Sequence, residues 1–337
     1  MKVLQKSDIV KYLKIREGEQ KAGECFRLLS EPSAKALNQT PGKYVVFGIP
    51  EDIGVRGNLG VEGARNAWKY FLGAFLNVQS NRFFTGNDVI LAGTFDFTSL
   101  YSDINNETTP GVYREKTEKV DEAVAAWVRA VKEAGKIPIA IGGGHNNAFG
   151  LLKGCSLAAK KPVNTVNCDP HSDFRKLEGR HSGNGFSYAY HQNYLKKYAV
   201  VALHEGYNAE SNLTSMEMTG GDVHFSFFED IFIRQKLILP HAFEQAYQHV
   251  RENYGIELDL DAVKNTPVSA LTSSGLTPEQ ARSYVHFFAS RGIPEYLHLC
   301  EAAPENLPQP PALTGKLLAY LTCDFIKAVN AQLGNND

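Results

Sequence analysis

Residues 167–175 read NCDPHSDFR and place Asp169, His171 and Asp173 at two-residue spacing. On a regular β-strand, alternate side chains share a face, so this spacing would point three metal-type ligands in one direction. The same residues also suit a polar loop after a strand, with carboxylates that cap the next helix. This segment alone leaves both interpretations open, and the rest of the chain has to decide between them.

Three other segments carry ligand-type side chains directly after apolar runs. His145 follows three glycines in IGGGH, Asp259 and Asp261 stand two apart in IELDLD, and Glu301 ends LHLCE. Taken singly, each has an ordinary structural explanation, such as a glycine turn, a helix cap or a loop. Ligands of open parallel sheets bind at the carboxyl ends of the strands, so the coincidence of these segments at strand ends favours one shared site.

The combined set contains five carboxylates and two histidines, and its chemistry predicts a metal centre. Carboxylates that converge in a low-dielectric cleft repel one another, and a divalent cation removes that repulsion. Oxygen and imidazole ligands without a thiolate suit a metal such as Mn²⁺ better than a structural zinc. Two ions about 3.5–4 Å apart could share bridging carboxylates and activate a water.

The elements that must position these side chains alternate along the chain. Strand-type runs cover 43–50, 87–97, 137–142, 162–169, 198–206, 222–231, 255–261 and 293–301. Helix-type patterns cover 62–75, 114–134, 243–253, 277–291 and 314–333, and the fourth opens with Thr277 as N-cap and Pro278 in the first turn. This alternation predicts an α/β fold with a mainly parallel sheet covered on both faces.

No segment rich in proline, glycine or serine divides the chain. The proline-rich residues 305–313 read as a loop before the last helix. We therefore expect a single domain over residues 1–337, with residues 1–40 as a peripheral, helical lead-in.

The 337 residues are 43% hydrophobic and 21% charged, with a formal net charge of −2. This balance suits a large core and predicts no general affinity for nucleic acid or for an anionic membrane. Five cysteines without a CxxC pair favour reduced, buried thiols. The chain has no apolar signal core and no apolar stretch of about 18 residues, so a cytoplasmic protein is expected. Its partner would be a small molecule, and a homo-oligomer stays possible.

These motifs resemble those of the ureohydrolase family, which includes arginase, agmatinase, formimidoylglutamase and guanidino-acid hydrolases. The resemblance covers roughly residues 43–333. It is carried by GGGH at 142–145, DPHSD at 169–173, ELDLD at 257–261 and EAAP at 301–304, and by GIP at 48–50 and GAR at 63–65.

The resemblance implies an arginase-like three-layer α/β/α fold with two Mn²⁺ ions. One ion would be held by His145, Asp169, Asp173 and Asp259, and the other by Asp169, His171, Asp259 and Asp261. Asp169 and Asp259 would bridge the two. A hydroxide between the ions would attack a planar C=N carbon, and Glu301 would face the cationic amidine or guanidine.

Two departures concern the substrate. Gly144 stands where arginase and agmatinase commonly have aspartate, which is more like the formimidoylglutamases. The segment SGNGF at 182–186 lacks the proton-shuttle histidine proposed for arginase. His181, just upstream, is one candidate substitute, and the alternative is that it is an exposed loop histidine without a catalytic role. Ser182 and Asn184 are candidate substrate-binding residues.

Arg175 lies two residues past Asp173, and its guanidinium could pair with one of the two carboxylates of N-formimino-L-glutamate. Arg180 would serve the other carboxylate or be solvated. Alternatively, Arg175 forms an ion pair with Asp173 or Glu178. The cationic tail of agmatine would be repelled.

The sequence therefore predicts a hydrolase most like formimidoylglutamase, which converts N-formimino-L-glutamate and water into L-glutamate and formamide. One alternative is a guanidino hydrolase that releases urea. The other is a noncatalytic, metal-binding relative that keeps the fold.

Overall fold

A computed structural model describes residues 1–105 and 107–334 of the chain. Its strands form one sheet in the order β1-β3-β2-β4-β9-β8-β5-β6-β7, and each neighbouring pair is parallel. The strands are β1 (Arg27–Leu28), β2 (Tyr44–Gly48), β3 (Val89–Thr94), β4 (Ile137–Ile141), β5 (Val163–Cys168), β6 (Leu195–Leu203), β7 (Val223–Phe227), β8 (Tyr254–Asp259) and β9 (Leu297–Cys300).

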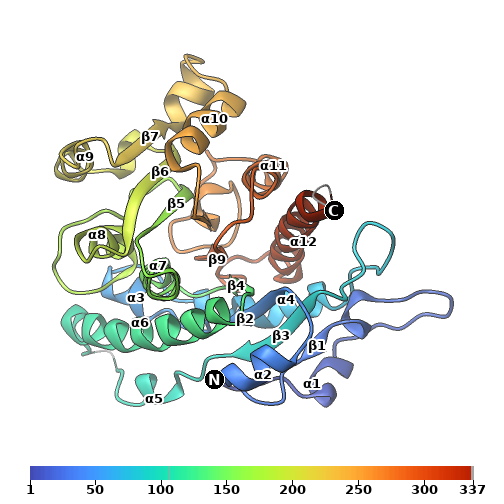
Figure 1. Ribbon diagram of the computed structural model, residues 1–337. Coiled ribbons are helices and arrows are strands. Elements are labelled where there is room, and N and C mark those ends of the chain that lie inside the picture. The colour runs from blue at the N-terminus through green and yellow to red at the C-terminus, as the bar shows by residue number, and fades with distance from the viewer. Residues whose placement is uncertain (106, 335–337) are drawn as a thin grey trace.

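Helices connect the strands and cover both faces of the sheet. They are α1 (Lys6–Val10), α2 (Ala34–Gln39), α3 (Ile53–Gly57), α4 (Ala67–Phe75), α5 (Thr98–Tyr101), α6 (Pro110–Glu133), α7 (Asn147–Ala159), α8 (Gly185–His191), α9 (Glu210–Glu217), α10 (Leu239–Val250), α11 (Pro278–Ala289) and α12 (Ala312–Gly334). In Figure 1 the strands run from β7 at the top, through β9 and β4, to β1 at the lower right.

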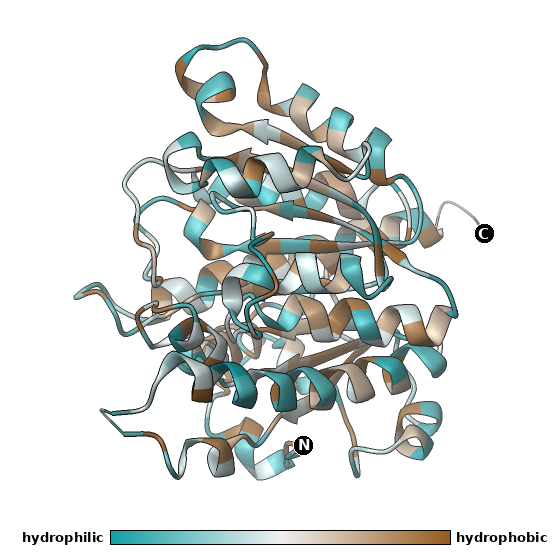
Figure 2. Cartoon of the chain, turned by 90° about the vertical axis from the view of Figure 1, so that its left-hand side faces the viewer, coloured by the Kyte–Doolittle hydropathy of each residue, from teal (hydrophilic) through white to brown (hydrophobic). Residues whose placement is uncertain are grey.

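Two hydrophobic cores, one on each face of the sheet, make the fold a three-layer sandwich. The first core joins the sheet to α4, α10, α11 and α12, and the second joins it to α6, α7 and α8. Figure 2 shows hydrophobic residues along the strands and mixed hydrophobic and polar residues on the helices, as expected for helices with one buried face. The predicted α/β/α fold is confirmed.

Burial on both faces explains why the strands read as continuous apolar runs. All five residues of β2 and all six of β8 are buried. Helix α11 begins as predicted: Thr277 caps it by accepting a hydrogen bond from the Gln280 amide, and Pro278 occupies the first turn. The predicted strand 222–231 is too long, because β7 ends at Phe227 and a π-helical turn follows over Glu229–Ile233.

The lead-in of residues 1–40 is not only helical. Its two-residue strand β1 pairs with β3 at the edge of the sheet, and Lys2 exchanges backbone hydrogen bonds with Thr94. The first 40 residues therefore contribute a sheet edge, which a two-residue strand gives too little sequence pattern to predict.

The strand order fixes where a site can form. Strands β4, β9, β8 and β5 are consecutive neighbours, although β9 comes last in the chain. The segments with ligand-type residues follow these four strands, so their carboxyl ends meet at one edge. Between β4 and α7 the chain turns through Gly142 and Gly143, whose φ angles of +81° and +75° favour glycine.

Candidate metal centre and substrate cavity

The imidazole of His145 lies at the centre of the ligand cluster. Its Nδ1 atom is 2.9 Å from Asp173 Oδ2, 3.0 Å from Asp169 Oδ2 and 3.2 Å from Asp259 Oδ2. These four side chains are buried, and their ligand atoms all lie within 4.8 Å of one another. The first ligand set implied by the sequence is therefore brought together.

The remaining two predicted ligands lie beside this group. His171 Nδ1 is 3.4 Å from Asp169 Oδ1 and 3.7 Å from Asp261 Oδ2. The two oxygens of Asp169 thus face different histidines, which is the geometry that a bridging carboxylate needs. Asp259 likewise turns Oδ2 toward His145, while its Oδ1 accepts a hydrogen bond from the Asp261 amide at 2.7 Å.

The two-residue spacing of these ligands does not arise from a regular strand. Strand β5 ends at Cys168, so Asp169, His171 and Asp173 lie in the loop that follows, and Asp173 has a φ of +46°. Asp261 lies in a 3₁₀ turn after β8. The alternative of a polar loop was thus right about the backbone. The loop nevertheless gathers the side chains, because Asp169 Oδ1 accepts the His171 amide at 2.7 Å.

The polar atoms left without partners fit a cation. His145 Nδ1 and Asp261 Oδ1 are buried and have no hydrogen bond of acceptable geometry among the described residues. Buried polar groups are normally satisfied, so each orphaned atom calls for an explanation. Divalent ions among these nitrogen and carboxylate donors would satisfy both atoms and neutralise the clustered charge.

The protonation equilibria show how strongly the carboxylates oppose one another. Burial raises the pKa of Asp259 well above its usual value, and the charges of Asp261 and Asp169 raise it further. Burial also raises the pKa of Asp261 to about 7. For Asp169, the neighbouring imidazoles of His145 and His171 outweigh burial and lower the pKa. A divalent cation among these carboxylates would relieve the repulsion that raises the pKa values of Asp259 and Asp261.

Glu301 directly follows β9 and lies beside the ligand cluster. Its Oε1 accepts the backbone N–H of His145 at 2.8 Å, and its φ of +60° is an unusual conformation for this residue type. Burial and the charges of Asp259 and Asp261 raise its pKa well above the ordinary range. Glu301 is therefore placed beside the ligands, as predicted.

A cavity of about 180 Å³ opens onto the cluster. Asp173, Asp259, Asp261, His171 and Glu301 line its inner part. Arg175 and the polar residues Asn58, Ser182, Asn208, Asn212 and Ser269 are among its other lining residues, together with Tyr207. The predicted substrate-binding residues Arg175 and Ser182 thus border the cavity.

Arg175 keeps a free guanidinium surface at this cavity. Its side chain is 49% exposed, and Nη2 lies 3.5 Å from Glu178 Oε1, at the outer limit of a hydrogen bond. The backbone N–H of Arg175 donates to the Gly183 carbonyl at 3.1 Å and fixes where the side chain begins. The ion pair with Glu178, one of the two alternatives from the sequence, is present but long.

Arg180 is neither at the cavity nor solvated, which corrects both expectations for it. It is 2% exposed, its Nε donates to Asp121 Oδ2 at 2.8 Å, and its Nη2 donates to the Asn146 carbonyl at 2.9 Å. Its guanidinium also stacks over Phe149 and Tyr188. Asp121 is 59 residues away in sequence, so local sequence could not reveal this pair.

His181 and Asn184 are also buried structural residues and do not line the cavity. His181 Nδ1 accepts the Gly183 amide at 3.1 Å, and Nε2 lies 3.3 Å from Glu178 Oε1. Burial lowers the pKa of His181 to about 4. Asn184 Oδ1 accepts from the His181 amide at 3.0 Å and from Arg180. His181 is therefore not an exposed loop histidine, and it does not border the cavity in which a proton shuttle would act.

Two positions that depart from the arginase pattern have clear packing roles. A Cβ atom at Gly144 would lie 2.6 Å from Asn146 Oδ1 and 2.7 Å from Val55 Cγ2, so a side chain there would have to displace these neighbours. The ring of Phe186 meets the His145 ring edge-on at 5.1 Å between centroids. The neighbouring residues thus occupy the space that a larger side chain would need.

Sequence reasoning missed two buried residues around the GGGH segment. Glu51 accepts hydrogen bonds from the amides of Gly144 and Ile53 and from the side chain of Asn147, and so anchors the glycine loop. Glu257 faces the Nε2 atom of His145 at 3.4 Å. Glu257 is the first residue of the ELDLD segment, but only the register of β8 against β9 shows that its side chain faces the site.

Two further sequence expectations can be compared with the structure. The five cysteines are free thiols, and all except Cys25 are buried, as expected for packing residues. Among the residues that the structure describes, no helix combines the length and the hydrophobicity needed to cross a membrane.

Comparison with known proteins identifies the class. Residues 42–325 match the model of the arginase family, and the chain belongs to that family. Its curated relatives include the formimidoylglutamases of Macrococcus caseolyticus, 27% identical over 60% of this chain and 64% of that protein, and of Rhodococcus jostii, 26% identical over 79% of each. The match to the Macrococcus protein thus spans slightly less than two thirds of that protein.

Solved structures agree on the fold. The Bacillus subtilis formimidoylglutamase superposes with a TM-score of 0.74 at 14% identity, over 97% of this chain and 99% of that one. A Trypanosoma cruzi formiminoglutamase variant crystallised with Mn²⁺ gives 0.71 at 20% identity, over 92% and 98%. At such identities the likeness establishes the arginase-like fold.

Removal of Asp169 provides a test of the metal centre. We expect Asp169→Ala to lose metal binding and activity, because among the described residues this is the only carboxylate within 4.0 Å of both His145 and His171. Metal analysis of the dialysed variant, with the wild-type protein treated in parallel, measures the loss. A variant that retains the wild-type metal content would show that the centre lies elsewhere.

Removal of Arg180 tests whether this residue is structural. We expect Arg180→Ala to lower the free energy of unfolding by about 3–5 kcal/mol, because Asp121 would be left buried without its cation. Urea unfolding of the variant and of Lys176→Ala, whose side chain is 81% exposed, measures the difference. Equal stability of the two variants would contradict the structural role.

Proposed function

We propose that this protein is a metal-dependent hydrolase of a linear amidine, with N-formimino-L-glutamate as its substrate. The observation that carries the proposal is the cavity, in which a metal-type ligand cluster and Arg175 border the same small space. The named relatives are formimidoylglutamases, which supports the same substrate. The reaction adds water to the formimino carbon, breaks its bond to the glutamate nitrogen, and gives L-glutamate and formamide.

The donor set suits two Mn²⁺ ions, held by the two groups of ligands named above. When bound, the ions would lower the pKa of a water molecule and stabilise the negative charge on its oxygen as that oxygen adds to the formimino carbon. Asp169 would contribute to both groups, since its Oδ1 faces His171 and its Oδ2 faces His145. The relative crystallised with Mn²⁺ supports this choice of metal.

Glu301 is placed to bind the amidine. Its carboxylate lies at the inner part of the cavity, and one oxygen is held by the His145 amide. A substrate amidinium can donate N–H groups to this carboxylate, and the pairing holds the planar carbon in one orientation. In this pairing the positive charge of the amidinium also stabilises the buried carboxylate of Glu301.

Arg175 selects the acidic end of the substrate. It is the only lysine or arginine among the residues that line the cavity, and its long contact to Glu178 leaves the guanidinium able to bind another carboxylate. Since Arg180 is committed to Asp121, the second carboxylate of the substrate would be met by neutral donors such as Asn58 and Ser182.

A substrate panel tests the proposal. Manganese-loaded protein is incubated with N-formimino-L-glutamate, L-arginine, agmatine and guanidinobutyrate, and formamide, glutamate and urea are measured. We expect formamide and glutamate from the first compound and no urea from the others, with Asp169→Ala as the inactive control. Urea release would instead support a guanidino hydrolase, and no turnover by metal-bound protein would favour the noncatalytic alternative.

The role of Arg175 has its own test. We expect Arg175→Ala to raise KM for N-formimino-L-glutamate by roughly 10-fold or more, since a charge-assisted hydrogen bond contributes about 1.5–3 kcal/mol. KM for a formimino compound without the side-chain carboxylate should change less. Lys176→Ala, a neighbouring exposed cation, provides the matched control. Equal increases for both compounds would remove Arg175 from substrate recognition.

A further inference from the structure

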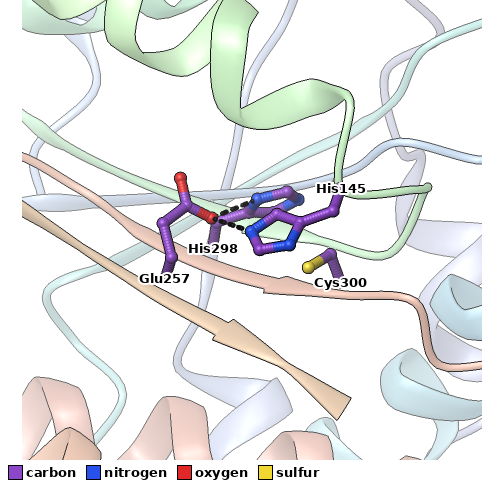
Figure 3. Close-up of side chains that lie close together, drawn as sticks. All are labelled: His145, Glu257, His298 and Cys300. Carbon is purple, nitrogen blue, oxygen red and sulfur yellow. Dashed lines mark hydrogen bonds and ion pairs between the residues drawn. The ribbon is translucent and has the colours of Figure 1, made fainter. Parts of the chain in front are cut away.

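A second buried cluster meets His145 on the opposite edge of its ring. In Figure 3 the rings of His145 and His298 each direct a nitrogen toward Glu257, and Cys300 lies beside the His145 ring; Glu257, His298 and Cys300 come from the neighbouring strands β8 and β9. All four side chains are buried. While His145 Nδ1 faces the aspartates, Nε2 is buried without a hydrogen bond of acceptable geometry among the described residues and lies 3.4 Å from Glu257 Oε2.

The strand register explains how these side chains meet. Glu257 on β8 is directly beside His298 on β9, and Asp259 is beside Cys300 two residues further on. Alternate residues of a strand share a face, so Glu257 lies on the same face as the ligand Asp259, one repeat deeper in the sheet. It therefore underlies the ligand cluster without being part of it.

Both oxygens of Glu257 are held by the protein. Its Oε1 accepts a hydrogen bond from the Tyr296 hydroxyl at 2.7 Å, and its Oε2 lies 2.6 Å from His298 Nδ1. Tyr296 is in turn within 3.2 Å of the Thr165 hydroxyl. These contacts fix the carboxylate in place, because moving it would break two hydrogen bonds in a buried region.

The cluster is not arranged as a metal site of its own. The 2.6 Å contact between Glu257 and His298 is a direct hydrogen bond, so a proton occupies the space between those two atoms. No residue of the Glu257–His298–Cys300 group lines the substrate cavity. Since the cluster binds neither a metal of its own nor the substrate, we look for the function of Glu257 in its contact with His145.

We propose that Glu257 is a positioning residue for the metal centre: it accepts the Nε2 proton of His145 and thereby presents the lone pair of Nδ1 to the ion. The nitrogen with which a histidine binds metal is set by the hydrogen bond that its other nitrogen makes. His298 and Tyr296 hold Glu257 for this task. The inference rests on the proposed metal site and adds a residue outside the ligand set.

Metal affinity measures this role directly. Glu257→Gln keeps the shape and one acceptor oxygen, whereas Glu257→Leu removes every acceptor. We expect the dissociation constant for Mn²⁺ to increase from wild type to Glu257→Gln to Glu257→Leu, with roughly 10–100-fold weaker binding in the last. The electron paramagnetic resonance signal of free Mn²⁺ reports binding without any activity assay.

Tyr284→Phe is the matched control. The Tyr284 hydroxyl donates to the backbone carbonyl of Glu257 at 3.0 Å, so its removal disturbs the same residue without touching the carboxylate. We expect this variant to be less stable to heat but to bind Mn²⁺ as tightly as the wild type. A loss of affinity equal to that of the Glu257 variants would show a general packing effect and overturn the proposal.

The remaining outcomes separate this role from the site itself. Folded Glu257 variants with wild-type affinity would overturn the positioning role alone. A wild-type protein that binds no Mn²⁺ would overturn the metal site and the inference with it. If Glu257→Leu does not fold, Tyr296→Phe carries the test: it removes one hydrogen bond to Glu257, and we expect roughly 2–5-fold weaker Mn²⁺ binding.

Discussion

Three carboxylates meet the imidazole of His145 at 2.9–3.2 Å in a buried part of the molecule. Such a group opposes folding, because each negative charge raises the cost of burying the next one. The structure holds the group together by drawing its members from the carboxyl ends of three strands of one sheet: β4 precedes His145, β8 ends at Asp259, and β5 precedes both Asp169 and Asp173. The helices on both faces then exclude water, which makes the electrostatic demand for a cation stronger.

The hydrogen bonds around the cluster orient the ligand atoms but do not neutralise their charge. Glu51 anchors the glycine loop before His145, and Glu301 accepts the His145 amide from the other side. Asp169 and Asp259 each accept a backbone amide from the loop that follows. Ligand directions are thus set by the backbone before an ion arrives, and such preorganisation reduces the ordering cost of binding.

The sequence was sufficient for the ligand segments, because parallel strands have a strong apolar pattern and their carboxyl ends must meet at one edge. The eight predicted strands correspond to β2 through β9, with ends that differ by a few residues.

Local sequence patterns could not predict contacts between side chains that are far apart in the sequence. The sequence leaves Arg180 with a substrate carboxylate or solvent as its partner, whereas the structure buries it against Asp121 in α6. The pairing of Glu257 with His298 likewise required the register of β8 against β9. Neither contact can be recognised from the residues that surround it in the sequence.

The position of β9 has a consequence for how the molecule is made. This strand contains residues 297–300 of 337, yet it lies between β4 and β8 in the middle of the sheet. Until the ribosome has released it, β4 and β8 each present an unpaired edge, and the two halves of the sheet have no strand to join them. Nascent chains with open edges are prone to pair with other chains. The site therefore cannot be complete until β9 has followed all the other strands of the sheet, and the insertion of β9 also joins the two halves of the sheet.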